Sequence, residues 1–532
     1  MASWHYNDGM SKEPPRPKLD SVALNHVVFW PPFLLLLFAV GLNFLSPDKV
    51  GDDGKIIPGG FSKVINGANG WILDHFSWLF SLCAFLALCL CIWICFSKFG
   101  KVRIGGSKAK PLMSMWNWFS ITICTTIAIG ILFWSTAEPV THYVELPADI
   151  AQPRTPEAAT FALSTMYLHW SFTPYALYCV ASLMFAFAYY NMKKPFSLGS
   201  TLTPLFGDWS TGKGGNIIDA VCLYSLVAGM AAALGSGILM LSGGLTDVAG
   251  IPSNSAVWAG ITFAIVATFI VSSATGLMNG IRILSDINTK LLMLLAVVAL
   301  ICGPTVWILT QSGAALVDYV VHFVPRNTQF FPENWGKNWT VFYWAVWLAW
   351  APITACFLGR ISYGRTVREF MLVNFIFPSL FAIVWMSIFS GTALYQEING
   401  VDLYQFIDAE KEEAVSYAVF KQFPFSTAVV IFYMVSAFVC FVTSSDSNMS
   451  AMASISSSGI SPENPEGQQW LKIVWGVAVG TVAWTMISFT GCTDGIKILS
   501  NLGGFPAAIL ELFIIGSLVR VVLFHEKLSV VE

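Results

Sequence analysis

Apolar runs of about twenty residues recur along the whole chain, and this repetition constrains the fold more than any other feature. A helix of about 20 apolar residues crosses the hydrocarbon core of a bilayer, so each run is long enough to span a membrane. Only 11% of the 532 residues are charged and 55% are hydrophobic, whereas soluble domains carry about 25% charged residues. The sequence therefore predicts an all-α, multi-pass integral membrane protein that is embedded in the lipid bilayer.

Twelve runs qualify as transmembrane helices, with limits near 28–46, 71–97, 113–137, 158–190, 217–241, 256–275, 287–311, 339–359, 370–395, 423–445, 470–490 and 503–524. An even number of spans puts both chain ends on one side of the membrane. The hydrophilic segments on that side contain most of the basic residues, including Lys98, Lys101, Arg103, Arg360 and Arg365. Because cytoplasmic loops carry an excess of Lys and Arg, we predict that both termini are cytoplasmic and that the membrane is the cell (inner) membrane.

Motifs of the common enzyme and cofactor sites are absent from the sequence, which has no Walker A motif, no HExxH, no CxxC pair and no GxSxG. Most of the eleven cysteines lie inside apolar runs, where we expect them to act as small buried hydrophobes. The first apolar run is too long for the hydrophobic region of a cleaved signal peptide. The net charge of -3 says nothing about nucleic acid, and we expect no nucleic-acid partner. We therefore expect a membrane protein without catalytic residues or a cofactor.

Large aromatic residues are concentrated in two of the runs. The stretch "VFYWAVWLAWAP" contains Tyr343, Trp344, Trp347 and Trp350, and "HWSFTPYALY" contains Trp170, Tyr175 and Tyr178. The faces of such rings attract a cation without supplying a formal charge, which suits an ammonium or sulfonium group that cannot donate hydrogen bonds. An interfacial aromatic belt is the competing interpretation; it fits Trp344 better than Trp347 and Trp350, which lie further along the run. A permanently cationic or zwitterionic solute is the predicted ligand.

Two runs contain residues that disfavour a regular helix. The first is "TTIAIGILFWSTAEPVTHY", where Gly130 is followed by Trp134, Glu138 and Pro139, and the second has five glycines between residues 229 and 244. Irregular backbone inside a membrane requires protein or water to satisfy its polar groups, and glycines also allow helices to pack closely. We expect the first run to face a ligand and the glycines of the second to serve packing. For His169, next to Trp170, we expect a structural role.

These stretches, together with "FLGRISYGRTVREF" and "FVTSSDS", resemble the betaine/choline/carnitine transporter (BCCT) family from about residue 25 to residue 520. The resemblance implies a secondary transporter with a LeuT-like fold, in which spans 3–7 and spans 8–12 form two inverted five-helix repeats. The chain would divide into a cytoplasmic N-terminal tail (1–25), peripheral spans (26–112), a first repeat (113–311), an outer connecting segment (312–338), a second repeat (339–524) and a short cytoplasmic C-terminal tail (525–532). A homotrimer is also implied.

In this family, a central aromatic box takes its residues from the fourth and eighth spans. The matching positions here are Trp170, Tyr175, Tyr178 and Trp347, with Gly130 lining the site from the third span and Trp350 lying toward the cytoplasmic exit. The chain departs from the family at Val346, where many members have a second Trp. Trp344 fits packing or the interface as well as it fits the site. Because of the departure at Val346, the sequence does not decide which solute of the betaine, choline, carnitine or dimethylsulfoniopropionate type is the substrate.

The resemblance also implies a possible Na⁺ site. Sodium-coupled members use a hydroxyl pair that corresponds to Thr443 and Ser444, with backbone ligands near Cys124 and Ile127. Sodium-independent exchangers place an arginine where this chain has Asn288, which carries no charge. The two hydroxyls could alternatively bond only to their own helix. We expect Na⁺-coupled import by alternating access, with choline-type proton symport and sodium-independent exchange as the alternatives.

Overall fold

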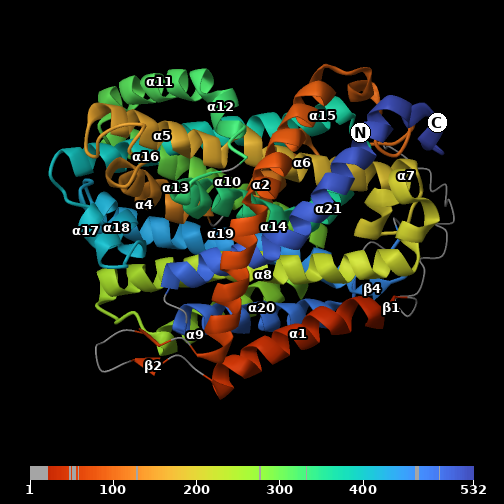
Figure 1. Cartoon of the computed structure of the whole chain (residues 1–532), viewed down its shortest axis with the longest axis horizontal. Coiled ribbons are helices and arrows are strands. Elements are labelled where there is room, and N and C mark those ends of the chain that lie inside the picture. Colours follow the sequence, from red (N-terminus) through yellow and green to blue (C-terminus); the bar gives the residue numbers. More distant parts are fainter. Residues whose placement is uncertain are drawn as a thin grey trace, which may run out of the picture.

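The computed structural model describes residues 22–46, 49–50, 56–57, 59–126, 130–274, 277–330, 332–461, 466–489 and 492–531. Within these ranges, strands are confined to two short antiparallel pairs. β1 (Ala23–Leu24) pairs with β4 (Ser457–Ser458), and β2 (Lys49–Val50) pairs with β3 (Ile56–Ile57). The other elements in these ranges are helices, which confirms the predicted all-α class (Figure 1).

The helices of the first half are α1 (His26–Leu45), α2 (Gly60–Phe96), α3 (Met115–Thr126), α4 (Gly130–Val144), α5 (Pro156–Trp170), α6 (Phe172–Ala186), α7 (Thr203–Phe206), α8 (Lys213–Ala249), α9 (Ser255–Ala274) and α10 (Leu277–Cys302). Those of the second half are α11 (Thr305–Val321), α12 (Phe323–Asn327), α13 (Asn334–Gly336), α14 (Phe342–Ile361), α15 (Val367–Met371), α16 (Phe377–Ile398), α17 (Tyr404–Asp408), α18 (Glu413–Lys421), α19 (Ser426–Ile455), α20 (Gln469–Phe489) and α21 (Cys492–Leu528). The short helices η2 (Lys98–Lys101), η4 (Leu198–Leu202) and η5 (Gly207–Thr211) are 3-10 helices, and η3 (Phe187–Asn191), η6 (Lys337–Val341) and η7 (Leu372–Ile376) are π-helical.

Ten helical segments of the described chain are long and apolar enough to cross a membrane. An eleventh is formed by α3 and α4 together, which are bent by 56° relative to each other. The predicted sixth span coincides with α9, whose apolar stretch Ser255–Val271 is shorter than the others. The multi-pass character is therefore confirmed. The total of twelve spans, the inverted repeats and the domain limits stay predictions.

The two irregular runs differ in geometry. The third span changes direction, since α3, which ends at Thr126, and α4, which begins at Gly130, are bent by 56° relative to each other. The glycine-rich run lies within the continuous helix α8, where the glycines allow close packing. A Cβ atom on Gly237 would collide with the ring of Phe441, and one on Gly229 would lie 3.1 Å from Trp350 Cδ1.

The predicted seventh span, 287–311, is wrong at its C-terminal end. α10 ends at Cys302 and α11 begins at Thr305. Pro304, which lies between them, has no amide hydrogen with which to continue α10. As a result, α11 includes the beginning of the predicted outer connecting segment, 312–338. The last helix, α21, is kinked at Phe524, where the backbone is non-helical, so the predicted limit at 524 coincides with the kink and a short stretch beyond it reaches Leu528.

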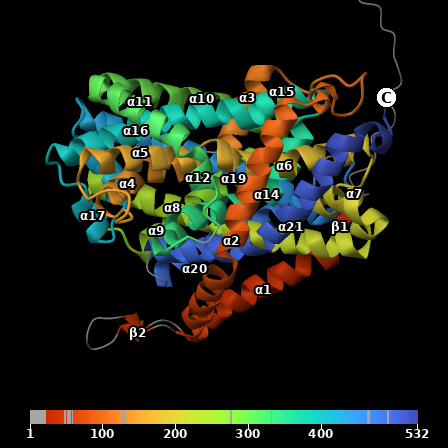
Figure 2. The same cartoon turned by 45° about the horizontal axis from the view of Figure 1, so that its top comes forward.

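The helix α14 lies in the middle of the molecule and packs against α6, α8 and α21 (Figure 1). α2 crosses these helices steeply on one face and packs against α6 and α21. α11 lies along an edge, next to α5 and α16 (Figure 2). The two spans that contain the aromatic concentrations are the most enclosed, since 94% of the apolar window is buried in each. Their rings therefore lie inside the protein, which excludes an interfacial belt as their main role.

The connecting segments are sorted to the two ends of the long axis. Figure 1 shows α7 at the right-hand end, α15 at the top to the right of the centre, and α17 and α18 at the left-hand end. The charge pattern of the sequence assigns the first pair to the basic side of the membrane and the second pair to the opposite side. The separation of these pairs agrees with the predicted alternation of loops.

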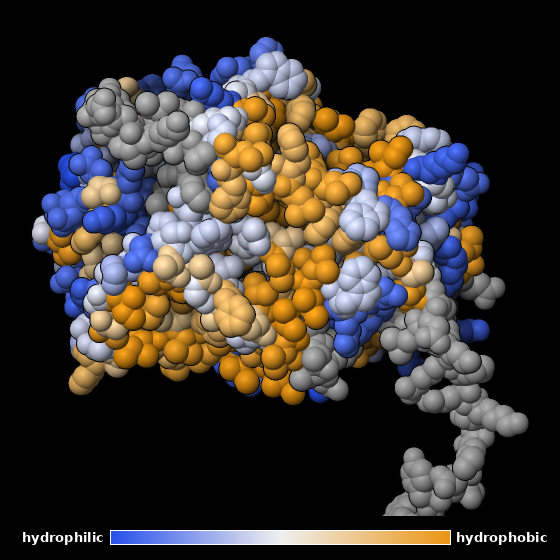
Figure 3. All heavy atoms as spheres, turned by 90° about the horizontal axis from the view of Figure 1, so that it is seen from below, coloured by the Kyte–Doolittle hydropathy of each residue, from blue (hydrophilic) through white to orange (hydrophobic). Residues whose placement is uncertain are grey.

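The surface has the character expected of a membrane protein. Figure 3 shows apolar side chains across the middle of one face and hydrophilic side chains at its left and right ends. Leu34, Leu35, Leu37 and Phe38 of α1 are each about half exposed or more. Such continuous apolar surface is stable against lipid and not against water.

Candidate functional site

The span that contains Trp170 is interrupted directly after this residue. α5 ends at Trp170, Ser171 has φ −115° and ψ −120°, and α6 begins at Phe172. Carbonyl groups in the last turn of a helix have no partner within the helix. One of them, the His169 carbonyl, accepts a hydrogen bond of 3.2 Å from Trp347 Nε1. The break in the span therefore ties α5 directly to α14.

The ring of Trp347 contacts the three other predicted box residues. Its centroid lies 5.7 Å from that of Trp170, 5.4 Å from that of Tyr175 and 5.0 Å from that of Tyr178. These separations are in the usual range for interacting aromatic rings, about 4.5–7 Å. The structure thus brings together the predicted aromatic residues of the fourth and eighth spans.

A cavity of about 60 Å³ lies against these rings. The described residues that line it are Thr125, Thr126, Gly130, Trp170, Tyr178, Ala233, Val346, Trp347, Trp350 and Ser444. Six of the eight predicted substrate residues are among them. The cavity also adds Thr125, Thr126 and Ala233, which sequence reasoning did not select.

Two predicted substrate residues do not line the cavity. Tyr175 is fully buried and packs against Trp347 and Tyr178. Trp344 is also buried, with its centroid 6.1 Å from the ring of His169. Tyr175 therefore supports the box from behind, and Trp344 has the packing role that was one of its two predicted roles.

Gly130 is required by the close approach of Trp170. A Cβ atom at this position would lie 2.6 Å from Trp170 Cη2, which is closer than real side-chain contacts allow. Trp350, predicted to lie toward the exit, faces the same cavity as Trp347, and Val346 is half-buried beside them. The missing aromatic ring at position 346 therefore leaves part of the cavity wall aliphatic.

The predicted Na⁺ residues divide between two neighbouring places. Asn288 Nδ2 donates to Thr443 Oγ1 over 3.2 Å and to Cys124 Sγ over 3.4 Å. Thr443 Oγ1 also bonds the Val439 carbonyl over 3.0 Å. Ser444 instead lines the aromatic cavity. α3, α10 and α19 therefore meet at a buried polar cluster beside the cavity, and Ile127 lies outside the described residues.

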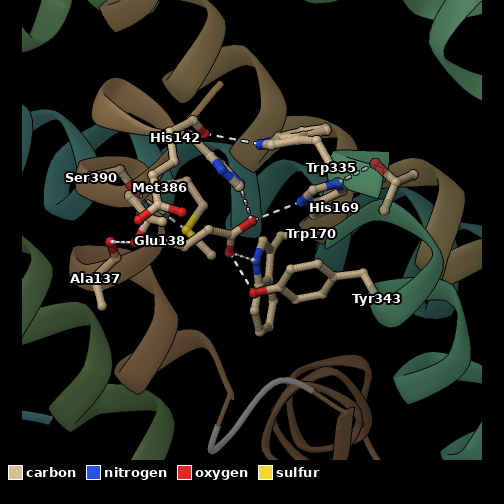
Figure 4. Close-up of polar contacts among 12 residues, drawn as sticks. Ala137, Glu138, His142, His169, Trp170, Trp335, Tyr343, Met386 and Ser390 are labelled. Atoms are coloured by element: carbon tan, nitrogen blue, oxygen red, sulfur yellow. Dashed lines mark hydrogen bonds and ion pairs between the residues drawn. The ribbon is translucent and has the colours of Figure 1, made fainter. Parts of the chain in front are cut away.

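A carboxylate that the sequence reasoning did not assign to the site lies behind Trp170 (Figure 4). Glu138 Oε2 accepts hydrogen bonds from Trp170 Nε1 over 3.0 Å and from the Tyr343 hydroxyl over 2.5 Å. Glu138 Oε1 lies 2.7 Å from His169 Nδ1 and 3.1 Å from His142 Nε2. The carboxyl group is fully buried. One buried carboxylate thus connects α4, α5 and α14.

Part of this cluster had a signal in the sequence. Glu138 and His142 are four residues apart, which places them on one face of a helix. His169, for which a structural role was expected, contacts both Glu138 and Thr340. The meeting of α4 with α5 and α14 had no signal, because it depends on how distant segments pack.

Comparison with known proteins identifies the family. The model of the family described as "BCCT, betaine/carnitine/choline family transporter" matches residues 27–527. The chain is 28% identical to the "Glycine betaine transporter OpuD" of Bacillus subtilis (strain 168), over 93% of this chain and 94% of that protein. It is 28% identical to the "Ectoine/hydroxyectoine transporter" of Virgibacillus pantothenticus, over 89% of this chain and 94% of that protein. The chain is 31% identical to the "High-affinity choline transport protein" of Escherichia coli (strain K12), over 85% of this chain and 66% of that protein. The chain belongs to the betaine/carnitine/choline transporter family, whose members are transporters and not enzymes.

Proposed function

We propose that this protein imports a small solute with a methylated ammonium or sulfonium group by alternating access. The observation that supports this most directly is the cavity enclosed by Trp170, Tyr178, Trp347 and Trp350. None of the described residues that line it is charged. A cation over an aromatic face is stabilised by about 2 kcal/mol or more when water is excluded. Such a lining suits a cation that has no hydrogen to donate.

The size of the cavity supports a mechanism in which the rings move. The cavity is narrow, with a volume of about 60 Å³ between the rings. We propose that the rings move apart when a trimethylated headgroup enters. A carrier that closes around its substrate near the middle of the membrane has this property.

The candidate substrates are solutes of the betaine, choline, carnitine and dimethylsulfoniopropionate type. The names of the relatives add ectoine as a solute to test, and they do not decide among the others. Titration of tryptophan fluorescence in the purified protein would rank these solutes by affinity, because Trp170, Trp347 and Trp350 all face the cavity. We expect at least one methylated ammonium or sulfonium compound to bind and to accumulate in proteoliposomes. Binding of none of them, or transport without saturation, would contradict the proposal.

Coupling to Na⁺ is the second part of the proposal. Thr443 and Cys124 contact the same Asn288 amide, so α3 and α19 approach each other where the resemblance implies a Na⁺ site. Ser444 places a hydroxyl oxygen on the adjoining cavity wall. An inward Na⁺ gradient should drive accumulation of substrate in proteoliposomes, and replacing Na⁺ by K⁺ should abolish it. Equal uptake in both salts would refute Na⁺ coupling and leave the aromatic cavity proposal intact.

One contact favours sodium-independent exchange as a second candidate. Asn288 Nδ2 donates a hydrogen bond of 3.2 Å to Thr443 Oγ1, the hydroxyl that the proposed Na⁺ site would use. If this hydroxyl does not bind Na⁺, uptake should require substrate on the opposite side. Counterflow from preloaded liposomes therefore distinguishes the two mechanisms. A choline-type proton symporter would instead respond to an imposed pH gradient in the absence of Na⁺.

The wider organisation follows from the same proposal. We place the protein in the cell (inner) membrane with both termini in the cytoplasm, because the basic segments of the sequence lie on one side. We also propose a homotrimer, on the family resemblance alone. Cross-linking in native membranes tests the trimer, and labelling of single cysteines at the two ends of the long axis tests the orientation.

A further inference from the structure

Three metal-binding side chains lie together behind the aromatic cavity. Their ligand atoms, Glu138 Oε1, His142 Nε2 and His169 Nδ1, all lie within 4.8 Å of one another. Oε1 is 2.7 Å from His169 Nδ1 and 3.1 Å from His142 Nε2. Tetrahedral Zn²⁺ with bonds of about 2.0–2.2 Å requires ligand atoms that are about 3.3 Å apart. The two contacts to Oε1 would lengthen by about 0.6 and 0.2 Å to reach this separation. The two imidazole nitrogens, which lie within 4.8 Å of each other, would also adjust toward it.

The groups around these ligands are arranged as the second layer of a metal site requires. Ligating histidines usually donate their other N–H group, and ligating carboxylates are usually hydrogen-bonded. His169 Nε2 lies 3.1 Å from Thr340 Oγ1, which leaves Nδ1 available for a metal. Glu138 binds the histidines through Oε1, while Oε2 accepts hydrogen bonds from Trp170 and Tyr343. A metal on Oε1 would leave both of these hydrogen bonds in place.

The tautomer of His142 is not held by a second partner. Its Nδ1 atom is buried and has no hydrogen-bond partner among the described residues. The ring is positioned by contacts with Trp335 and Trp339, whose centroids are 5.0 and 4.7 Å away. Without a metal, Nε2 carries the proton that it donates to Glu138; on metal binding this proton can move to Nδ1, so that the Nε2 lone pair faces the ion. Nitrogen ligands of this kind suit Zn²⁺, Co²⁺ and Ni²⁺ better than Ca²⁺ or Mg²⁺.

The cluster lies directly beneath a large cavity through which an ion could arrive. This cavity has a volume of about 1070 Å³ and is lined by Trp335 and Thr340, both of which contact the cluster. Its lining has four carboxylates (Asp149, Glu157, Asp318 and Glu333) against the cations Arg326 and Lys337, although Asp318 is paired with Arg326 and His322. The acidic excess would attract a cation. The segment predicted to be the outer connection, 312–338, forms much of the wall. An external divalent ion would thus have only one layer of side chains to pass.

We propose that Glu138, His142 and His169 form a binding site for a divalent transition-metal ion of the Zn²⁺ class. One carboxylate and two neutral imidazoles supply three ligands, and a water molecule or an anion from the cavity would be the fourth. The bound ion joins α4 to α5 and, through Oε2, restrains Trp170 and Tyr343. Because the aromatic cavity must widen to admit a substrate, the occupied site inhibits uptake. The inhibition depends on the proposed transport function, whereas the binding of the ion does not.

The first test measures metal binding to the full-length protein in nanodiscs, independently of transport. Co²⁺ is the probe, because four-coordinate Co²⁺ has an intense visible absorption, and Zn²⁺ is then used to displace it. We expect one ion per chain in the unmodified protein. His142→Gln removes one of three ligands and should weaken Zn²⁺ binding by at least about 100-fold, because even partners of the ligands contribute about 10–100-fold. His322→Ala is the matched control, since His322 lines the same large cavity and is paired with Asp318 outside the cluster.

A second variant distinguishes the loss of a metal ligand from a folding defect. His142→Cys replaces the imidazole by a thiolate, and its Co²⁺ complex should show a sulfur-to-cobalt charge-transfer band that the unmodified protein lacks. The proposal is overturned if the unmodified protein binds no Co²⁺ or Zn²⁺, if His142→Gln binds them as tightly, or if His322→Ala abolishes the binding. Uptake is measured last, with and without Zn²⁺. Metal binding without inhibition would retain the site and refute the restraint on Trp170, and an absence of uptake in all samples would instead refute the proposed function.

Discussion

The indole nitrogen of Trp170 donates a hydrogen bond of 3.0 Å to Glu138 Oε2, so that a buried carboxylate sets the orientation of a ring in the aromatic cavity. The same oxygen accepts a hydrogen bond from the Tyr343 hydroxyl on α14. The cavity is therefore shaped by two layers of residues. The rings form its surface, and a charged group that does not line it keeps one of those rings in place.

Glu138→Gln should weaken substrate binding by disturbing Trp170. The amide has a single acceptor oxygen and cannot accept from all four present donors. A hydrogen bond to a charged group contributes about 1.5–3 kcal/mol, which corresponds to a loss of affinity of about 10- to 100-fold. Fluorescence titration with the best substrate measures the change. Glu145→Gln is the matched control, because Glu145 is exposed and accepts a hydrogen bond from Tyr404 outside the cluster. An equal loss of substrate affinity in both variants would contradict a specific role for Glu138.

Trp347→Ala should abolish substrate binding, because this ring contacts Trp170, Tyr175 and Tyr178 and also faces the cavity. Loss of one desolvated cation–π contact costs about 2 kcal/mol or more. Trp347→Phe keeps a ring face and should retain part of the affinity. Trp344→Phe serves as the control on the same helix, since Trp344 is buried outside the cavity. Unchanged affinity in Trp347→Ala would mean that the rings serve packing only.

Gly130→Ala should lower affinity while the protein still folds. The added methyl group would lie 2.6 Å from Trp170 Cη2 and would force this ring to move. Overpacking of this kind costs about 1–3 kcal/mol. Gly67→Ala on α2 is the control, because a Cβ atom there meets nothing within 4 Å. Thermal stability and substrate affinity are measured for both, and normal affinity in Gly130→Ala would show that Trp170 can adapt.

Thr443→Val should weaken the stimulation of uptake by Na⁺ if the proposed coupling is correct. The valine keeps the volume of the side chain and removes the hydroxyl that contacts Asn288. The hydroxyl would also be lost as a ligand of Na⁺, and a contact with a charged group contributes about 1.5–3 kcal/mol. The Na⁺ concentration for half-maximal uptake would therefore rise by about 10- to 100-fold. Ser436→Ala removes another buried hydroxyl of α19, which donates to the Phe432 carbonyl of the preceding turn. A rise of the same size in Ser436→Ala would point to a general disturbance of the helix.

The thermal stability of the protein should fall as the pH is raised through about 7, in part because of Glu413. Burial against Gly243 and Tyr417 raises the pKa of this carboxyl, which lies on α18 outside the membrane-spanning helices, to about 7. The folded protein then binds a proton more tightly than the unfolded chain, so the stabilising contribution is present at low pH and is lost as Glu413 ionises. Glu413→Gln should flatten this part of the profile. Glu410→Gln, at an exposed position, should not, and a profile that Glu413→Gln leaves unchanged would exclude this cause.

The sequence by itself determined the fold class, most of the spans and the family. Long apolar runs require a bilayer, and this property is local to each run. The same holds for the change of direction near Gly130. The end of α10 before Pro304 was not predicted, since the seventh span was expected to continue to residue 311. The aromatic residues of the box were also identified from sequence, because motifs on two spans resemble those of the family.

Only the tertiary structure decided which of these residues meet. It placed Trp344 and Tyr175 away from the cavity wall, put Ser444 on that wall, and joined Asn288 to Thr443. It also brought His142 and His169 to one oxygen of Glu138. The physical reason is that hydropathy and helix periodicity describe one segment at a time. A contact between residues about 30 to 200 positions apart, such as Glu138 with His169 or Tyr343, depends on how the helices pack against one another.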